Sequence, residues 1–307
     1  MKRQFLNDDF FASLDSSTLD VNEAQMLPPE CYTSEDFYEF EKGALQQVVA
    51  DLRAALPPQY PIRHYPDITH TIMCQFPVPD WDLAYALTEN REPINPRPTQ
   101  YEHIFHLFNE GTIGFLSYSE GCNDDVNKII WSGLGWDPNQ SAEAILKSYA
   151  RYFIGPIHEE AFAKGLLALE QDWVGPLASN DGIAKTLATF QAMERTATDA
   201  EKSNWRFQQA LYRAYYDAYD HERVKYENTL QDEALAALAE APKQGALAAM
   251  DASEAILDKA VKQPVARELR TRVFMLAEAL FQSIRMQLSV PFYQAIHAER
   301  GANLDLI

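Results

Sequence analysis

Two stretches decide the fold that the sequence predicts: YPIRHYPDITHTIMCQFPVPDW at residues 60–81 and GTIGFLSYSEGCNDDVNKIIW at residues 111–131. Each reads as a short strand that runs into a cluster of polar and aromatic residues, and the segment between them reads as helical. In a βαβ unit, side chains at the carboxyl ends of parallel strands build the functional site. The sequence therefore predicts an α/β region, a partial (β/α)-barrel-like βαβ unit, followed by an all-α helical bundle.

The composition excludes several classes of protein. The chain has 307 residues, 47% of them hydrophobic, and a formal net charge of −19. Binding of nucleic acid or of an anionic membrane needs clustered Lys and Arg, so neither partner is expected. The three cysteines form no CxxC pair, which argues against a disulfide framework and a cysteine-based zinc site. With no apolar run that resembles a signal or a membrane span, we expect a cytoplasmic protein.

Three regions are expected along the chain. Residues 1–45 read as a largely non-globular leader, residues 46–138 as the partial barrel-like region and residues 139–307 as the all-α domain. Apolar residues recur at helical spacing throughout the last region, and the TDAE sequence at 198–201 predicts a capping box that opens a long helix. No alternation with a period of two residues is present there, which favours a helical bundle.

The first predicted strand ends in an H-x-x-D-x-x-H cluster of His64, Asp67 and His70. Asp67 is a candidate general base, sugar-hydroxyl ligand or metal ligand, although a carboxylate at this position can equally cap a turn. No further ligand spacing supports a metal site, so we predict no metal and no cofactor. Trp81 and Asp82 follow, and an aromatic ring beside a carboxylate suits sugar binding.

The second predicted strand contains Glu120, which we identify as the best catalytic candidate. It follows the apolar run at residues 113–116, where partial burial is expected to raise its pKa towards the range of a general acid. A structural ion pair is the alternative. Tyr118, Asn123 and Asp124 are candidate substrate-binding residues, although the last two can also cap the next helix.

Residues 60–307 resemble the carboxyl-terminal part of a group of bacterial, glycoside-hydrolase-like proteins. Seven segments carry the resemblance: YPDITHT (65–71), PVPDWDLAYALTE (77–89), INPRP (94–98), YSEGCNDDVNK (118–128), YARYFIG (149–155), NWRFQQALYRAYYDAY (204–219) and LFQSIRMQLSV…RGANLD (280–305). The resemblance implies a carbohydrate-active protein with a small-molecule or oligosaccharide ligand. Glu120 would be one carboxylate of the catalytic pair and Asp67, or alternatively Asp82, the other, with His70 among the substrate ligands.

Residues 26–45, which include LPPECYTSEDFYEFEKGAL, resemble the lead-in of Rieske-type aromatic-ring-hydroxylating oxygenase large subunits. The Cys-x-His pair that would hold an iron–sulfur cluster is missing. The resemblances together imply a fusion and a truncated hydrolase-like part, whose exposed barrel edges would favour self-association. A non-catalytic helical interaction or scaffold module is the second hypothesis, and a remnant of an oxygenase component is the third.

Overall fold

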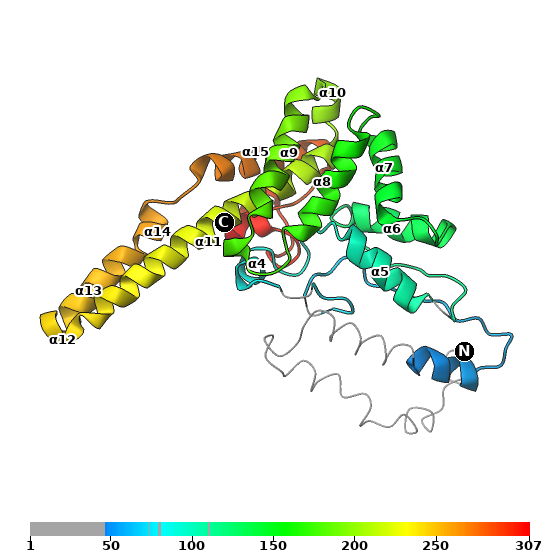
Figure 1. Cartoon of the computed structure of the whole chain (residues 1–307), viewed down its shortest axis with the longest axis horizontal. Helices are drawn as coiled ribbons and strands as arrows, with labels where there is room; N and C mark the ends of the chain where they lie inside the picture. Colours follow the sequence, from blue (N-terminus) through cyan, green and yellow to red (C-terminus); the bar gives the residue numbers. More distant parts are fainter. Residues whose placement is uncertain (1–46, 73, 79–80, 110) are drawn as a thin grey trace. The chain divides into compact units, whose positions relative to one another are not determined.

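A computed structural model describes residues 47–72, 74–78, 81–109 and 111–307 (Figure 1). These residues divide into two compact units. The first contains residues 47–64 and 106–116, and the second contains residues 65–105 and 117–307. The expected leader, including the segment with the oxygenase resemblance, lies outside the described residues.

The described chain is mostly helical. Its α-helices are α4 (Leu83–Thr88), α5 (Pro98–Phe108), α6 (Asp125–Trp136), α7 (Ala142–Phe153), α8 (Glu159–Gln171), α9 (Gly182–Thr196), α10 (Asp199–Lys202), α11 (Trp205–Ala239), α12 (Ala241–Gln244), α13 (Ala246–Leu257), α14 (Lys259–Lys262), α15 (Arg267–Ile284) and α16 (Val290–Tyr293). Residues 47–55 are also helical, and 3₁₀ turns η2 and η3 cover Leu177–Ser179 and Asn303–Leu306.

The predicted βαβ unit is wrong, because the described residues contain no strand, sheet or barrel. Only two isolated parallel bridges remain where the strands were expected, His64 with Phe115 in the first unit and Asp67 with Tyr118 in the second. Proline supplies no backbone N–H to a ladder, and two prolines, at positions 61 and 66, interrupt the first expected strand. The barrel edges expected to drive self-association are therefore absent from the described chain.

Residues 139–307 are helical, as the periodicity predicted, with short connecting loops. The predicted capping box is confirmed: the Thr198 side chain accepts from the N–H of Glu201, and Glu201 bonds back to the N–H of Thr198. It opens the one-turn helix α10 rather than the long helix. The long helix α11 starts at Trp205, where the side chain of Asn204 accepts from the N–H of Arg206.

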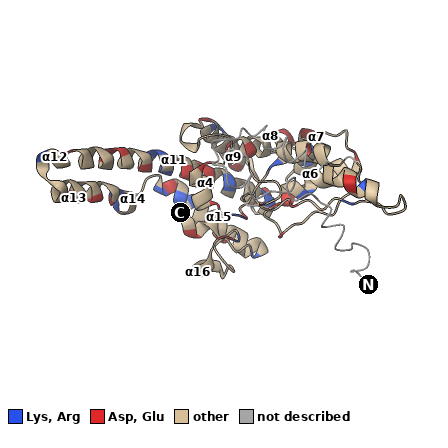
Figure 2. Cartoon of the chain, turned by 90° about the horizontal axis from the view of Figure 1, so that it is seen from below, with Lys and Arg blue, Asp and Glu red and all other residues tan. Residues whose placement is uncertain are grey.

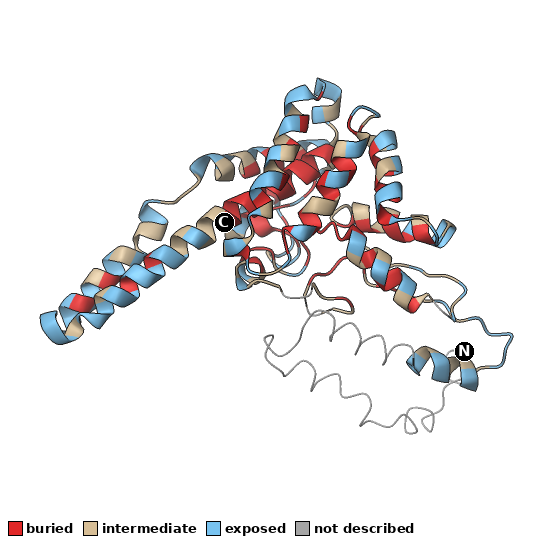
Figure 3. Cartoon of the chain, viewed as in Figure 1, coloured by how far each residue is buried: buried red, intermediate tan, exposed pale blue. Residues whose placement is uncertain are grey.

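Helix α11 runs through the core of the second unit. Every residue from Phe207 to His221 is buried, and α9, α13 and α15 pack against this helix (Figure 3). Beside it, Tyr85 of α4 packs in one apolar cluster with Trp173 and Leu177. A typical surface helix buries one apolar face and keeps its polar side chains in water. This part of α11 is enclosed on all sides, so its polar side chains must find hydrogen-bond partners inside the protein.

The polar groups of α11 meet around one guanidinium. Arg213 is fully buried and forms ion pairs with Glu89, from the loop after α4, and with Asp217, one turn along α11. The indole N–H of Trp173 donates to Asp217 at 3.1 Å, and the side-chain amide of Asn303 donates to Glu89 at 2.6 Å. This buried network joins α4, α11 and η3.

Two more buried carboxyl groups lie in the same core. Thr88 donates to Asp220 at 2.6 Å and Thr186 donates to Asp172 at 2.9 Å. Burial, reinforced by the charge of Asp217, raises the pKa of Asp172 to about 8. Burial also raises the pKa of Asp220 well above its usual value. Asp172 is therefore mostly protonated near neutral pH, and burial disfavours the charged form of Asp220.

Beyond the core, α11 continues as an arm that doubles back through α12 into α13 (Figure 1). Leu247 and Val261 are exposed on this part of the chain, at 78% and 83%. Acidic residues lie scattered along the helices in the view of Figure 2 rather than gathered into one patch. Among the described helices, none combines the length and the apolar character needed to cross a membrane.

Candidate active site

The site is built around His70, whose ring is held by Asp67. One Asp67 oxygen accepts from the backbone N–H groups of Thr69 and His70 at 3.1 and 3.4 Å, and the other lies 2.5 Å from His70 Nδ1. Burial alone would raise the pKa of Asp67, but the hydrogen bonds from His70 and Thr69 hold it below its usual value. Because Nδ1 is engaged by Asp67, the other ring nitrogen, Nε2, is left to face the site.

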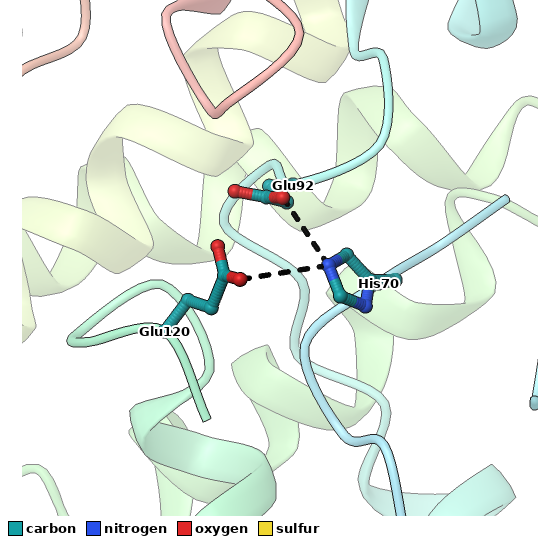
Figure 4. Close-up of side chains that lie close together, drawn as sticks. All are labelled: His70, Glu92 and Glu120. Carbon is teal, nitrogen blue, oxygen red and sulfur yellow. Dashed lines mark hydrogen bonds and ion pairs between the residues drawn. The ribbon is translucent and has the colours of Figure 1, made fainter. Parts of the chain in front are cut away.

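Two glutamates face that nitrogen (Figure 4). Glu92 Oε1 lies 3.2 Å from His70 Nε2, and Glu120 Oε1 lies 3.9 Å from it. The three side chains come from three loops: the loop before α4, the loop between α4 and α5, and the loop before α6. Burial would lower the pKa of His70, but its hydrogen bonds with Asp67 and Glu92 raise it to about 9. The imidazole is therefore protonated near neutral pH.

Arg300 closes the site from the carboxyl-terminal part of the chain. Its Nε lies 2.8 Å from Glu92 Oε1, and its terminal nitrogen lies 2.5 Å from Glu120 Oε2. The next residue, Gly301, has φ of +85°, and a Cβ there would approach the backbone oxygen of Glu92 to 2.7 Å. Glycine is thus required for the close approach that brings the guanidinium onto both glutamates.

Tyr118 completes the wall around Glu120. Its hydroxyl donates to Glu120, and its ring stacks on that of His70 with centroids 5.6 Å apart and planes inclined by 21°. Burial would raise the pKa of Glu120, but its side-chain hydrogen bonds with Glu92, Tyr118 and Arg300 lower it to about 2. The raised pKa predicted for a general acid is therefore not found, and Glu120 is ionised across the neutral range.

A cavity of about 250 Å³ opens beside these groups. Glu92, Glu120, Asn123 and Arg300 line one side of it. The rest of the lining comes from the loop before α6, the loop between α15 and α16 and the loop that follows α16. His70 and Glu92 are buried, at 4% and 3% exposure. Glu120 and Arg300 are the more open members, so they are the ionised groups that a ligand in the cavity would meet.

A layer of hydrogen bonds behind the site fixes the loops. Thr69 Oγ1 donates to Asp124 Oδ2 at 2.7 Å and accepts from the backbone N–H of Glu120 at 3.1 Å. Ser119 donates to Asp124 Oδ1 at 3.1 Å. The Asn123 side-chain amide donates to the backbone oxygen of Glu92 at 2.7 Å. Asp124 therefore joins the two loops, and Asn123 serves both the loop of Glu92 and the cavity wall.

The structure brings together most of the residues that the sequence predicted for a site. Asp67, His70, Tyr118 and Glu120 lie in direct contact, and Asn123 and Asp124 border them. Two predicted residues, Trp81 and Asp82, serve the core of the second unit instead.

Trp81 and Asp82 are held by contacts at the start of α4. The Trp81 ring lies 5.0 Å from that of Trp173, within the apolar cluster. One Asp82 oxygen accepts from the N–H of Ala84 at 2.8 Å as the N-cap of α4, and the other accepts from the N–H of Leu177 at 2.8 Å. A carboxylate that caps a helix and ties down a loop stabilises the fold, and both residues are absent from the lining of the cavity.

Sequence reasoning missed Glu92 and Arg300. Both lie within or beside segments that carried the family resemblance: Glu92 stands between ALTE and INPRP, and Arg300 begins RGANLD. Neither sits in a periodic pattern or next to another titratable group of the site. The remaining signal was Gly301, since glycine allows close approach of the backbone to another segment.

Comparison with known proteins yields no relative: no protein-family model, no curated protein and no solved structure matches this chain.

Proposed function

We propose that this protein binds glycosides in the cavity and acts on them through the paired carboxylates of Glu92 and Glu120. The observation that carries the proposal is the separation of the two groups, whose facing oxygen atoms lie within 4.8 Å of each other on the cavity wall. Retaining glycoside hydrolases place their two carboxyl groups about 5–5.5 Å apart, whereas inverting enzymes need about 6.5–9.5 Å. The upper bound of 4.8 Å lies below the spacing of inverting enzymes, so a retaining mechanism is the one that we assign in this proposal.

The two carboxylates take different roles in this proposal. Glu120, with its pKa lowered to about 2, supplies the ionised nucleophile. Glu92 supplies the acid and base: the proton that it passes to the leaving group comes from the protonated ring of His70, whose Nε2 lies 3.2 Å from Glu92 Oε1, and the proton taken from water in the second step returns to that ring. In this proposal Asp67, which the sequence offered as a catalytic residue, instead orients the His70 ring. A glycoside entering the cavity replaces one of the bonds from Arg300 with a bond from its own hydroxyl groups.

The size of the cavity limits the ligand. Its volume of about 250 Å³ is below the roughly 300–1,000 Å³ typical of sites for drug-sized ligands. A single sugar residue fits this volume better than an oligosaccharide. Exo-type action on one terminal residue, or binding of a monosaccharide, is therefore the form of activity that we expect.

A panel of 4-nitrophenyl glycosides tests the proposal, with calorimetric titration of the corresponding free sugars. Glu120→Gln should abolish hydrolysis while the circular dichroism spectrum stays unchanged, because the amide keeps the shape and removes the charge. Glu299→Gln is the matched control, because this substitution removes the same charge from an exposed position beside Arg300. Absence of both hydrolysis and sugar binding across the panel would overturn the proposal.

A second candidate function, a non-catalytic helical interaction module, is favoured by exposed apolar side chains. Leu247 on α13 and Val261 on α14 are among them. Exposed apolar surface of this kind is typical of protein contacts. Light scattering of the purified chain at increasing concentration distinguishes this candidate, because replacing both residues by Ser should abolish any association without affecting sugar binding.

A further inference from the structure

We propose that His70, Glu92 and Glu120 form a binding site for a divalent transition-metal cation, Zn²⁺ or Mn²⁺. One ring nitrogen and one oxygen from each glutamate all lie within 4.8 Å of one another. The inference does not depend on the proposed glycoside chemistry, because binding of the cation is measured in the absence of any sugar.

The spacing of the donor atoms suits a metal ion. Ligand atoms held at about 2.0–2.2 Å around a tetrahedral ion lie about 3.3–3.6 Å from one another. The distances from His70 Nε2 to the nearest oxygens of Glu92 and Glu120 are 3.2 and 3.9 Å. Small rotations of the two glutamate side chains therefore bring all three donors to bonding distance.

The orientation of the imidazole is fixed as it is in known metal sites. A metal-bound histidine usually directs its second ring nitrogen at a carboxylate or a backbone carbonyl, which sets the tautomer and the ring direction. Here Asp67 Oδ2 lies 2.5 Å from Nδ1, and the Asp67 carboxylate is itself fixed by two backbone N–H groups. Stacking on Tyr118 limits rotation of the ring. Nε2 is thus presented to the two glutamates.

Charge also favours a cation at this position. Three carboxylates, those of Asp67, Glu92 and Glu120, surround the imidazole, and one guanidinium, that of Arg300, reaches two of them. Arg300 is itself a cation that pairs with both glutamates. Its side chain is 49% exposed, so it has room to move out into solvent. A divalent ion therefore displaces Arg300 from the glutamates and replaces the proton that Nε2 shares with Glu92.

The donor set selects the class of metal. Imidazole suits Zn²⁺ and other late first-row ions, whereas carboxylates suit Mn²⁺ and Mg²⁺. A set of one imidazole and two carboxylates lies between these classes, and Mg²⁺ is reluctant to give up its water for nitrogen ligands. The cavity beside Glu92 and Glu120 leaves room for water on the remaining coordination positions.

Calorimetric titration of the full chain with Zn²⁺ alone, after dialysis against a chelator, tests the proposal. Glu120→Gln should weaken binding at least tenfold, and Arg300→Gln should strengthen it because the competing guanidinium is gone. Glu299→Gln, which removes the same charge from the neighbouring surface, should leave the affinity unchanged. Equal losses in Glu120→Gln and Glu299→Gln would show non-specific attraction to an acidic protein, and weaker binding in Arg300→Gln would show that the guanidinium does not compete with the cation; either result would overturn the site.

A second measurement needs no variant. Mn²⁺ bound to the unmodified chain should show nitrogen hyperfine coupling from one imidazole in pulsed electron paramagnetic resonance. A spectrum with oxygen ligands only would exclude His70 and refute the assignment. Because neither experiment contains a sugar, a cation site without hydrolysis and hydrolysis without a cation site are distinct results.

Discussion

Replacing Arg213 by Met removes the guanidinium that pairs with two buried carboxylates, Glu89 and Asp217. All three side chains are fully buried. Removing one partner of a buried ion pair typically costs about 3–5 kcal/mol, because a charge is left without compensation. The Arg213 guanidinium also lies over the rings of Trp173 and Tyr216, at 5.2 and 4.8 Å. We therefore expect Arg213→Met to lower the free energy of unfolding by about 4 kcal/mol or more near neutral pH.

This loss should depend on pH with a defined sign. Burial raises the pKa of Asp217 to about 6 even though Arg213 lowers it, so the pKa rises further once Arg213 is gone. A carboxyl group with a raised pKa in the folded state contributes stability at low pH that is lost as the pH rises through that pKa. The deficit of the variant should accordingly be small near pH 4 and should grow above about pH 6.

Urea denaturation followed by circular dichroism and tryptophan fluorescence, at about pH 5 and about pH 8, measures both effects. Adding Glu89→Gln and Asp217→Asn to Arg213→Met removes the uncompensated charges and should recover most of the lost stability. A deficit below about 1 kcal/mol at the higher pH, far under the typical cost of a broken buried pair, would refute the reasoning. So would a deficit equal at the two pH values.

Three further outcomes are expected. Asp172→Asn should make thermal stability less dependent on pH between about pH 4 and pH 8, because the raised pKa of Asp172 costs stability as the pH rises through that window; an unchanged pH profile would contradict this. Gly165→Ala should lower stability by about 1–3 kcal/mol in urea denaturation, since its Cβ would lie 2.7 Å from the Phe190 ring, and a stabilised variant would mean that the ring moves aside. Gly301→Ala should weaken the binding of free sugars and of Zn²⁺ in calorimetric titration, because a Cβ would lie 2.7 Å from the backbone oxygen of Glu92. Unchanged affinity would show that the site does not need the close approach of Gly301 to Glu92.

The helical half of the fold could be predicted because local pattern dictates it. Phe162, Leu166 and Leu169 lie on the buried face of α8, where their spacing of four and three residues placed them. The first half could not, because prolines 61 and 66 withhold two N–H groups from the ladder, and the backbone hydrogen bonds that do form, such as Ile113 N–H to Ile62 O, do not extend into strands. Prolines and glycines leave one parallel bridge in each compact unit.

The candidate site was partly predictable for a related reason. Asp67, His70 and Glu120 were expected together because their two segments were predicted to run in parallel, and the bridge between Asp67 and Tyr118 is parallel although no strand forms. Glu92 and Arg300 were missed because no local pattern links them. Their contact spans 208 residues of sequence and depends on the tertiary packing of the whole second unit.

The long reach of these contacts bears on how the protein is made. Arg300 meets Glu120 across 180 residues, and Asn303 meets Glu89 across 214. Contacts between residues so distant in sequence form late and slow the folding of a domain. During synthesis the loops of His70, Glu92 and Glu120 leave the ribosome long before the segment that completes them. Until the segment with Arg300 has emerged, a nascent chain therefore carries the acidic side chains of the site without their guanidinium. A chaperone or a cation that binds at that stage meets no competing positive charge from Arg300.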